Sequence, residues 1–219
     1  MLFPSEILIG SEMLRRAFTM LELVFVIVVV GILAISIIPR LERDNVGEAA
    51  YQIARHIRLA QHHALVEDHF DNTSDWKKKM WRIAFTHSNP HNGDCYDVFS
   101  DRNKAGNVDS TEAAIDPLTK KSLFSSNCAD GSNYNEDVLL WKKYGVDSVS
   151  FSAGCSPATG SPNKYIAFDH LGRPYSKIGE YLNGDCVISI TTSDNHSAEV
   201  TIYEESGFVK VTKIDSVVL

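Results

Sequence analysis

The most informative segment begins Arg15-Arg16-Ala17-Phe18-Thr19-Met20-Leu21-Glu22 and continues as an apolar run from Leu23 to Ile38. Every residue of that run except Gly31 and Ser36 is strongly apolar. With the four residues before Glu22 added, the segment is long enough to cross a bilayer at about 1.5 Å per helical residue. We therefore expect a membrane-spanning helix over residues 18–39.

Glu22 is the unusual residue of this segment, because a carboxylate costs about 2.5 to 3.5 kcal/mol at the bilayer centre and somewhat less near the interface. No Lys or Arg lies within a turn of it on the C-terminal side. Cleavage between Ala17 and Phe18 would create an α-amino group four positions before Glu22, in the same chain or in a neighbouring one. The sequence thus favours a charge pair across a subunit contact.

These residues resemble the type IV prepilin signal of type IV pilins and of the pseudopilins of type II secretion. In that family a prepilin peptidase cuts before an aromatic residue and methylates the new amine, which the glutamate at mature position five attracts in an adjacent subunit. The resemblance implies processing at Ala17 and Phe18 and an assembly role for Glu22. Ala17 replaces the usual glycine, and the leader is longer than usual. The sequence leaves open whether translation begins at Met1 or Met13.

The resemblance also implies a topology: a single-pass protein of the bacterial inner membrane, with its C-terminal domain in the periplasm. The flanking arginines alone do not fix this orientation. The expected organisation is a prepilin leader, the membrane-spanning half of an N-terminal helix, the amphipathic half of the same helix, and a periplasmic β-sheet domain with loop insertions, over residues 1–17, 18–39, 40–67 and 68–219.

Beyond Pro39 the apolar residues form one helical stripe, because they recur in alternating steps of four and three at Val46, Ala50, Ile53, Ile57, Ala60 and Ala64. The sequence therefore predicts one long helix, kinked at Pro39, from Phe18 to about Val66. Three histidines, His56, His62 and His63, are interpreted as facing solvent.

Short β-type runs separated by turn residues follow the helix. The expected strands are Trp81 to Thr86, Cys95 to Ser100, Val146 to Phe151, Lys164 to Asp169, Cys186 to Thr192, Ala198 to Tyr203 and Gly207 to Lys213. We expect these to form an antiparallel sheet packed on the striped half of the long helix, which is the α+β pilin fold.

A second resemblance covers the C-terminal part of the chain. A strand ending in a Gly-Arg-Pro turn, followed by two more strands, is similar to the C-terminal domain of GspH/FimT-type minor pseudopilins. The segments concerned are Tyr165 to Pro174, Val187 to Ile190 and Ser206 to Val209.

Together the two resemblances imply a structural subunit of a type II secretion pseudopilus that supports protein secretion. The alternative is a minor type IV pilus subunit used in adhesion, twitching or DNA uptake. The implied partners are the prepilin peptidase, other pilins or pseudopilins, an inner-membrane assembly platform and the membrane itself.

The four cysteines, Cys95, Cys128, Cys155 and Cys186, all follow the expected span and would face the oxidising periplasm. Two disulfides are expected, and three connectivities are possible. The preferred pairs are Cys95 with Cys128 and Cys155 with Cys186, since each closes a loop that contains turn residues.

The segment from Asp101 to Glu112 has the ligand spacing of an EF-hand loop. Asp101, Asn103, Asp109 and Glu112 occupy positions one, three, nine and twelve, and Gly106 occupies position six. Position five carries an alanine, and a strand is expected before the loop. An ordinary surface turn is the preferred interpretation and a calcium site is the alternative, so no cofactor is required.

Neither catalysis nor nucleic-acid binding is expected. The chain has no Gly-x-Ser-x-Gly, phosphate-loop or metalloprotease motif. A formal net charge of -7 disfavours a phosphate-binding face, and the only basic cluster of note is Lys77-Lys78-Lys79.

Overall fold

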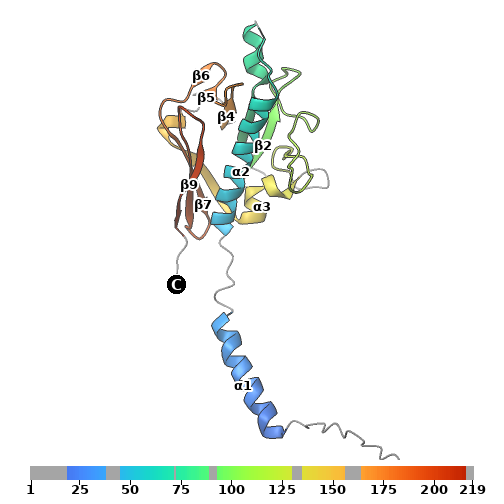
Figure 1. Cartoon of the computed structure of the whole chain (residues 1–219), viewed down its shortest axis with the longest axis vertical. Coiled ribbons are helices and arrows are strands. Elements are labelled where there is room, and N and C mark those ends of the chain that lie inside the picture. The colour runs from blue at the N-terminus through green and yellow to red at the C-terminus, as the bar shows by residue number, and fades with distance from the viewer. Residues whose placement is uncertain are drawn as a thin grey trace, which may run out of the picture. The chain divides into compact units, whose positions relative to one another are not determined.

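The computed structural model describes residues 19–37, 45–71, 73–88, 93–129, 135–155 and 164–215, without the side chains of residues 35–37 and 74. The chain divides into two compact units, Met1–Arg43 and Asp44–Leu219, which are considered separately (Figure 1).

Helix α1 (Met20–Ile37) is the described element of the first unit. It begins at a capping residue, because the Thr19 hydroxyl oxygen accepts a hydrogen bond from the Glu22 amide at 3.2 Å. Thr19 and Glu22 also have the spacing of a capping box. The helix ends two residues before Pro39, as expected for a residue that lacks an amide donor and restricts the backbone before it.

The expected long N-terminal helix packed on a sheet is wrong. The structure has two separate helices in its place, α1 and α2 (Asn45–Val66), which belong to different units. Both helical patterns are present, as one helix that ends at Ile37 and another that begins at Asn45. Pro39, which lacks the amide donor that a continuous helix requires, lies outside the described residues.

The expected membrane span over residues 18–39 is also wrong, and with it the single-pass inner-membrane localisation. Within the described residues, no helix is both long enough and apolar enough to cross a membrane.

The second unit contains a five-stranded sheet in the order β2-β1-β4-β5-β6. All its pairings are antiparallel. The register places Ile83 opposite both Val98 and Ile166, and all three side chains are buried. The strands are β1 (Trp81–Ser88), β2 (Gly93–Ser100), β4 (Lys164–Phe168), β5 (Pro174–Lys177) and β6 (Glu180–Tyr181).

A four-stranded antiparallel sheet follows the order β3-β7-β8-β9. Its strands are β3 (Val146–Phe151), β7 (Cys186–Thr192), β8 (Ser197–Ile202) and β9 (Val209–Asp215). Strand β7 alternates buried and half-buried residues, which is the pattern of a strand with one face toward a core. Ile188 lies opposite Val200, and both are fully buried.

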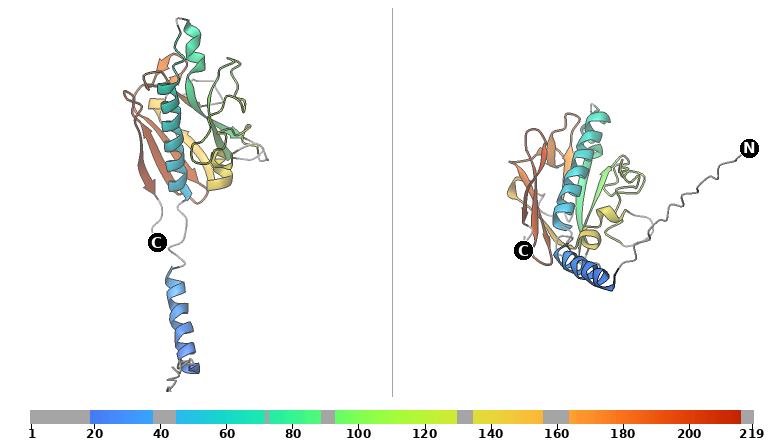
Figure 2. Two further views of the ribbon diagram at one scale, coloured as in Figure 1. Left: turned by 45° about the vertical axis from the view of Figure 1, so that its right-hand side comes forward. Right: turned by 60° about the horizontal axis from the view of Figure 1, so that its bottom comes forward.

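Helix α2 packs against both sheets, as Figures 1 and 2 show. All six residues of its apolar stripe are buried, so that part of the sequence analysis is confirmed. Polar side chains add specific ties: Arg58 donates to the Val209 carbonyl at 2.7 Å, and Gln61 donates to the Gly172 and Ser206 carbonyls at 2.9 and 3.0 Å. The helix thus holds the turns and strands of both sheets together.

The seven expected strand ranges coincide with strands of the structure to within a few residues. They lie in two sheets instead of one, and the short strands β5 and β6 were not predicted. Alternation of buried and exposed residues identifies a strand but does not identify its neighbours, so a single sheet could not be distinguished from two.

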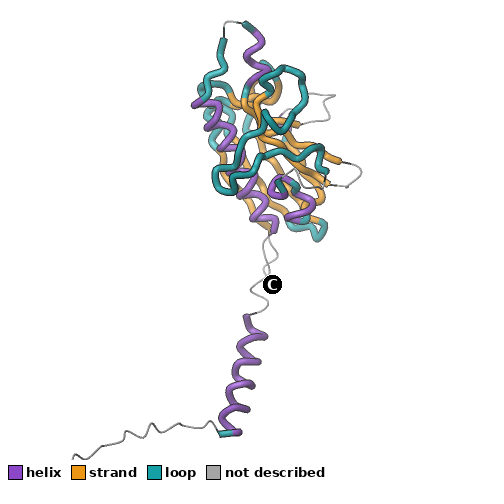
Figure 3. The backbone as a smooth tube through the Cα atoms, turned by 90° about the vertical axis from the view of Figure 1, so that its right-hand side faces the viewer, coloured by secondary structure: helices purple, strands orange, loops and turns teal. Residues whose placement is uncertain are grey.

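A long loop, residues 101–129, follows β2 and contacts its outer side (Figures 1 and 3). Val98 accepts a hydrogen bond from Ala114 at 2.7 Å and donates one to the Leu123 carbonyl at 3.0 Å, and Ser100 donates to the Glu112 carbonyl at 3.2 Å.

The remaining short elements are helix α3 (Leu140–Tyr144) and the 3-10 turns η2 (Ser74–Lys79), η3 (Glu136–Val138) and η4 (Ala153–Cys155).

His56 is fully buried, so its interpretation as a solvent-facing residue is wrong. Its Nδ1 lies 2.7 Å from the Tyr96 hydroxyl, and its Nε2 lies 3.2 Å from the Arg55 guanidinium. Because Arg55 can only donate, Nε2 accepts and the Nδ1 hydrogen is donated to Tyr96. Burial, with the charge of Arg55, lowers the pKa of His56 to about 4.

The protein should therefore lose stability as the pH falls from about 6.5 toward 4. Across this window His56 becomes protonated in the unfolded chain but stays neutral in the folded chain. The free energy of unfolding falls by roughly 3 kcal/mol when this difference is complete. Urea unfolding of the wild type and of His56→Asn, measured at several pH values, checks this. The variant should be less stable at pH 7 but should lack this acid-induced loss.

The comparison with the variant is necessary because Asp97 titrates in an overlapping range with the opposite sign. Burial raises the pKa of Asp97 to about 6, so its protonation stabilises the fold as the pH falls. The exposed His62, changed to Asn on the same helix, is the matched control and should keep the wild-type pH dependence. An unchanged acid-induced loss in His56→Asn would contradict the assignment.

Candidate assembly site

Glu22 lies in the first turn of α1, where a carboxylate is favoured by the partial positive charge of the helix N-terminus. Its backbone amide is capped by Thr19. Among the described residues its carboxylate has no ion-pair partner. Ala17 and Phe18, the residues expected to be processed, lie outside the described residues.

Apart from Glu22, α1 presents apolar side chains on every side over the part whose side chains are described, which ends at residue 34. From Met20 to Leu33, the twelve large apolar side chains are each at least 42% exposed. Such a continuous apolar surface is far larger than the scattered apolar residues of an ordinary protein surface. The helix therefore offers an area for association with another apolar surface.

The cysteines form the two disulfides preferred from the sequence. Cys95 bonds Cys128 with 5.4 Å between their Cα atoms, and Cys155 bonds Cys186 with 4.4 Å between theirs. All four residues are buried. The first disulfide encloses the loop that pairs with β2, and the second joins η4 to the start of β7.

The four residues of the possible calcium loop lie on one compact turn. Asp101 accepts the Gly106 amide at 3.0 Å, and Glu112 accepts the Asn103 amide at 3.0 Å. Asp109 accepts the Asn103 side-chain amide at 3.4 Å. Across the described ranges, no three His, Cys, Asp or Glu side chains converge to hold a metal ion between them.

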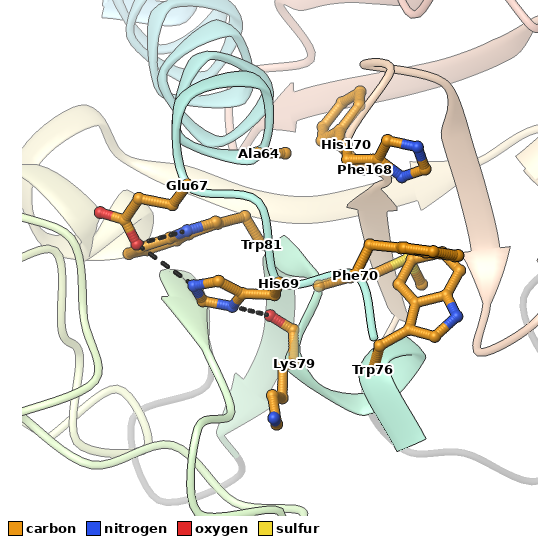
Figure 4. Close-up of a pocket in the computed structure, with 10 residues that line it drawn as sticks. Ala64, Glu67, His69, Phe70, Trp76, Lys79, Trp81, Phe168 and His170 are labelled. Atoms are coloured by element: carbon orange, nitrogen blue, oxygen red, sulfur yellow. Dashed lines mark hydrogen bonds and ion pairs between the residues drawn. The ribbon is translucent and has the colours of Figure 1, made fainter. Parts of the chain in front are cut away.

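A small hollow lies at the C-terminal end of α2 (Figure 4). Its volume of about 10 Å³ is enough for at most one water molecule. Glu67 organises the polar side of this region, because its carboxylate accepts the Trp81 indole at 3.2 Å and lies 3.5 Å from His69. Phe70, Trp76 and His170 form the aromatic side. This network joins residues far apart in the sequence and was not predicted.

The basic cluster is largely neutralised. Lys78 lies 3.3 Å from Asp75 and Lys79 lies 3.6 Å from Asp71. Lysines already paired with carboxylates offer little attraction to phosphate groups. This geometry gives no support to nucleic-acid binding at Lys77-Lys78-Lys79.

An open hollow of about 550 Å³ lies over the turn between β8 and β9. It is bordered by the exposed rings of Tyr203 and Phe208 and by acidic side chains, with Lys210 at its margin. The acidic residues are Asp185, Glu204 and Glu205. An open surface of this kind is suited to contact with another protein more than to enclosing a small substrate.

Comparison of the chain with protein-family models, with curated proteins and with solved structures gave no match.

Proposed function

We propose that the protein is a structural subunit of a type II secretion pseudopilus, of the minor pseudopilin type, which joins the filament through α1. The observation that carries the proposal is the exposed apolar surface of α1 with a carboxylate in its first turn. A helix of this kind gains stability when it packs against equivalent helices of neighbouring subunits.

In this proposal Glu22 sets the axial position of each subunit. A prepilin peptidase cuts after Ala17, and the methylated amine of Phe18 remains positively charged. That amine meets Glu22 of the adjacent subunit as the apolar helices pack, which leaves neither charge unpaired. The second unit, stabilised by two disulfides, presents its surface to cargo, to other pseudopilins and to the assembly platform.

The intact mass of protein purified from its native host tests the processing step. We expect a single species that lacks residues 1–17, carries one methyl group on Phe18 and retains both disulfides. A species that begins at Met1 or Met13 would contradict the proposal. Expression in a strain without prepilin peptidase is the matched control and should give the uncut, unmethylated chain.

Deletion of the coding sequence in the native host tests the choice between secretion and a type IV pilus. The pseudopilus proposal expects exported enzymes to accumulate inside the cell while surface pili are unchanged. Loss of adhesion, twitching or DNA uptake with normal secretion would favour the pilus subunit instead. Complementation with the wild-type chain should restore secretion.

A further inference from the structure

The loop from Asp101 to Glu112 contains two buried carboxylate oxygens that have no hydrogen-bond partner among the described residues. These atoms are Oδ1 of Asp101 and Oε2 of Glu112. The two residues are only 3% and 4% exposed. Because a buried anionic oxygen without a donor is costly, the loop is incomplete as it stands. We propose that it binds a calcium ion.

The partnered oxygens of the same carboxylates show how the loop is held in shape. Asp101 Oδ2 accepts the amide of Gly106, which has a φ of +80° that favours glycine. Glu112 Oε1 accepts the amide of Asn103. Each carboxylate is therefore fixed by one oxygen, and its second oxygen is left for a cation.

The positions of these residues match a known calcium-binding spacing. Asp101 and Glu112 are the first and twelfth residues of the loop, with Asn103 at position three and Gly106 at the sharp turn of position six. Position seven contributes a backbone carbonyl in such loops, which here belongs to Asn107. All of these donor atoms are oxygens. Oxygen ligands suit calcium, whereas zinc and copper are usually bound through imidazole or sulfur ligands.

Both carboxylate oxygens of Asp109 accept hydrogen bonds within the loop, so the proposal gives this side chain no direct ligand role. Its Oδ1 accepts the Thr111 amide at 2.8 Å, which agrees with the lack of three converging acidic side chains in the described residues. Position nine of such loops often binds through water. With two buried carboxylates instead of four acidic ligands, the loop belongs among calcium sites of weaker affinity, about 10⁻⁵ to 10⁻³ M.

The two cations of the loop do not compete for its carboxylates. Lys104 lies 3.1 Å from Asp75, and Arg102 lies 3.7 Å from Glu67. Both partners are outside the loop, so the loop carboxylates are not paired with either of these side chains. The charges of Asp101 and Glu112 also act on the buried guanidinium of Arg82, which offsets part of their negative charge but is hydrogen-bonded to neither unpartnered oxygen.

Calorimetric titration of the full-length, oxidised protein with CaCl2, after chelator treatment, tests the proposal. We expect one saturable site for calcium, and a rise of the thermal unfolding midpoint that magnesium at the same concentration does not reproduce. Magnesium is the discriminating ion because it demands near-ideal octahedral geometry and dehydrates reluctantly. No saturable signal up to about 10 mM calcium, or an equal response to magnesium, would overturn the proposal.

Three variants and one control locate the ion. Asp101→Asn and Glu112→Gln should each weaken calcium binding roughly tenfold or more. The reason is that mutation of a residue that only hydrogen-bonds to a metal ligand already lowers metal affinity by about 10- to 100-fold. Asn103→Ala should weaken calcium binding as well. Because the Asn103 side chain is exposed, misfolding of the variant would not explain such a loss. Glu205→Gln, an equal change of charge on an exposed turn, should bind calcium like the wild type. Wild-type affinity in all three loop variants would place the ion elsewhere and overturn the proposal.

Discussion

Under the proposed function, Glu22→Gln should prevent incorporation of the protein into the pseudopilus. If a neighbouring subunit's amine pairs with Glu22 in an apolar contact, loss of one partner leaves the other charge buried alone and costs about 3 to 5 kcal/mol. This corresponds to a loss of incorporation of roughly 100-fold or more. The measurement is the fraction of the protein that sediments with filaments isolated from the native host.

Glutamine is the informative replacement because Glu22 has two roles that must be separated. It occupies the last position of a capping box with Thr19, and glutamine can fill that position as well as glutamate. Helix α1 should therefore survive the change, while the charge is lost. Glu22→Asp should retain part of the incorporation, and Glu180→Gln on strand β6, where the side chain is exposed, should retain all of it. Wild-type incorporation of Glu22→Gln would show that the residue only caps the helix.

Removal of either disulfide should destabilise the second unit by about 4 kcal/mol. The paired cysteines are 33 and 31 residues apart, and in the chain-entropy model a cross-link of that length restricts the unfolded state by this amount. Since single domains are stable by about 5 to 15 kcal/mol, the chain without both disulfides should be close to unfolding. Urea unfolding of the two double alanine variants, Cys95→Ala with Cys128→Ala and Cys155→Ala with Cys186→Ala, gives each value.

Hydrogen exchange distinguishes the two disulfides. Loss of the Cys95–Cys128 bond should expose the Ala114 and Leu123 amides, which are hydrogen-bonded within the region that this bond encloses. Loss of the Cys155–Cys186 bond should leave these two amides protected. Equal protection in both variants would mean that the loop is held by its hydrogen bonds alone.

The strongest local patterns of the sequence correctly predicted the buried face of α2 and the positions of the expected strands. The buried face of α2 follows from the three-and-four spacing of its apolar residues, and the strands follow from short β-branched runs. His56 was assigned wrongly because periodicity counts apolar residues only. The partners that make its burial acceptable, Tyr96 and Arg55, include one 40 residues away in the sequence.

The arrangement of the helices and the geometry around individual residues could not be predicted from these local sequence patterns. Two adjacent helical patterns are compatible with one continuous helix and with two separate helices, so the pattern alone did not predict that α1 and α2 are separate. The sequence singles out Glu22 by its charge in an apolar segment, and its assembly role stays a prediction. Its capping by Thr19 became evident only with the backbone geometry. In the loop, the spacing predicts Asp101 and Glu112 as possible ligands, whereas their burial became evident only with the structure.

The pairing of the 101–129 loop with β2 has a consequence for solubility. Strand β2 ends the five-stranded sheet, and the groups of Val98 and Ser100 that the loop occupies are those that would otherwise recruit a strand from another molecule. The Cys95–Cys128 bond keeps this cover in place. A reduced chain would therefore expose a template for β-type aggregation, so correct oxidation protects the protein against self-association as well as against unfolding.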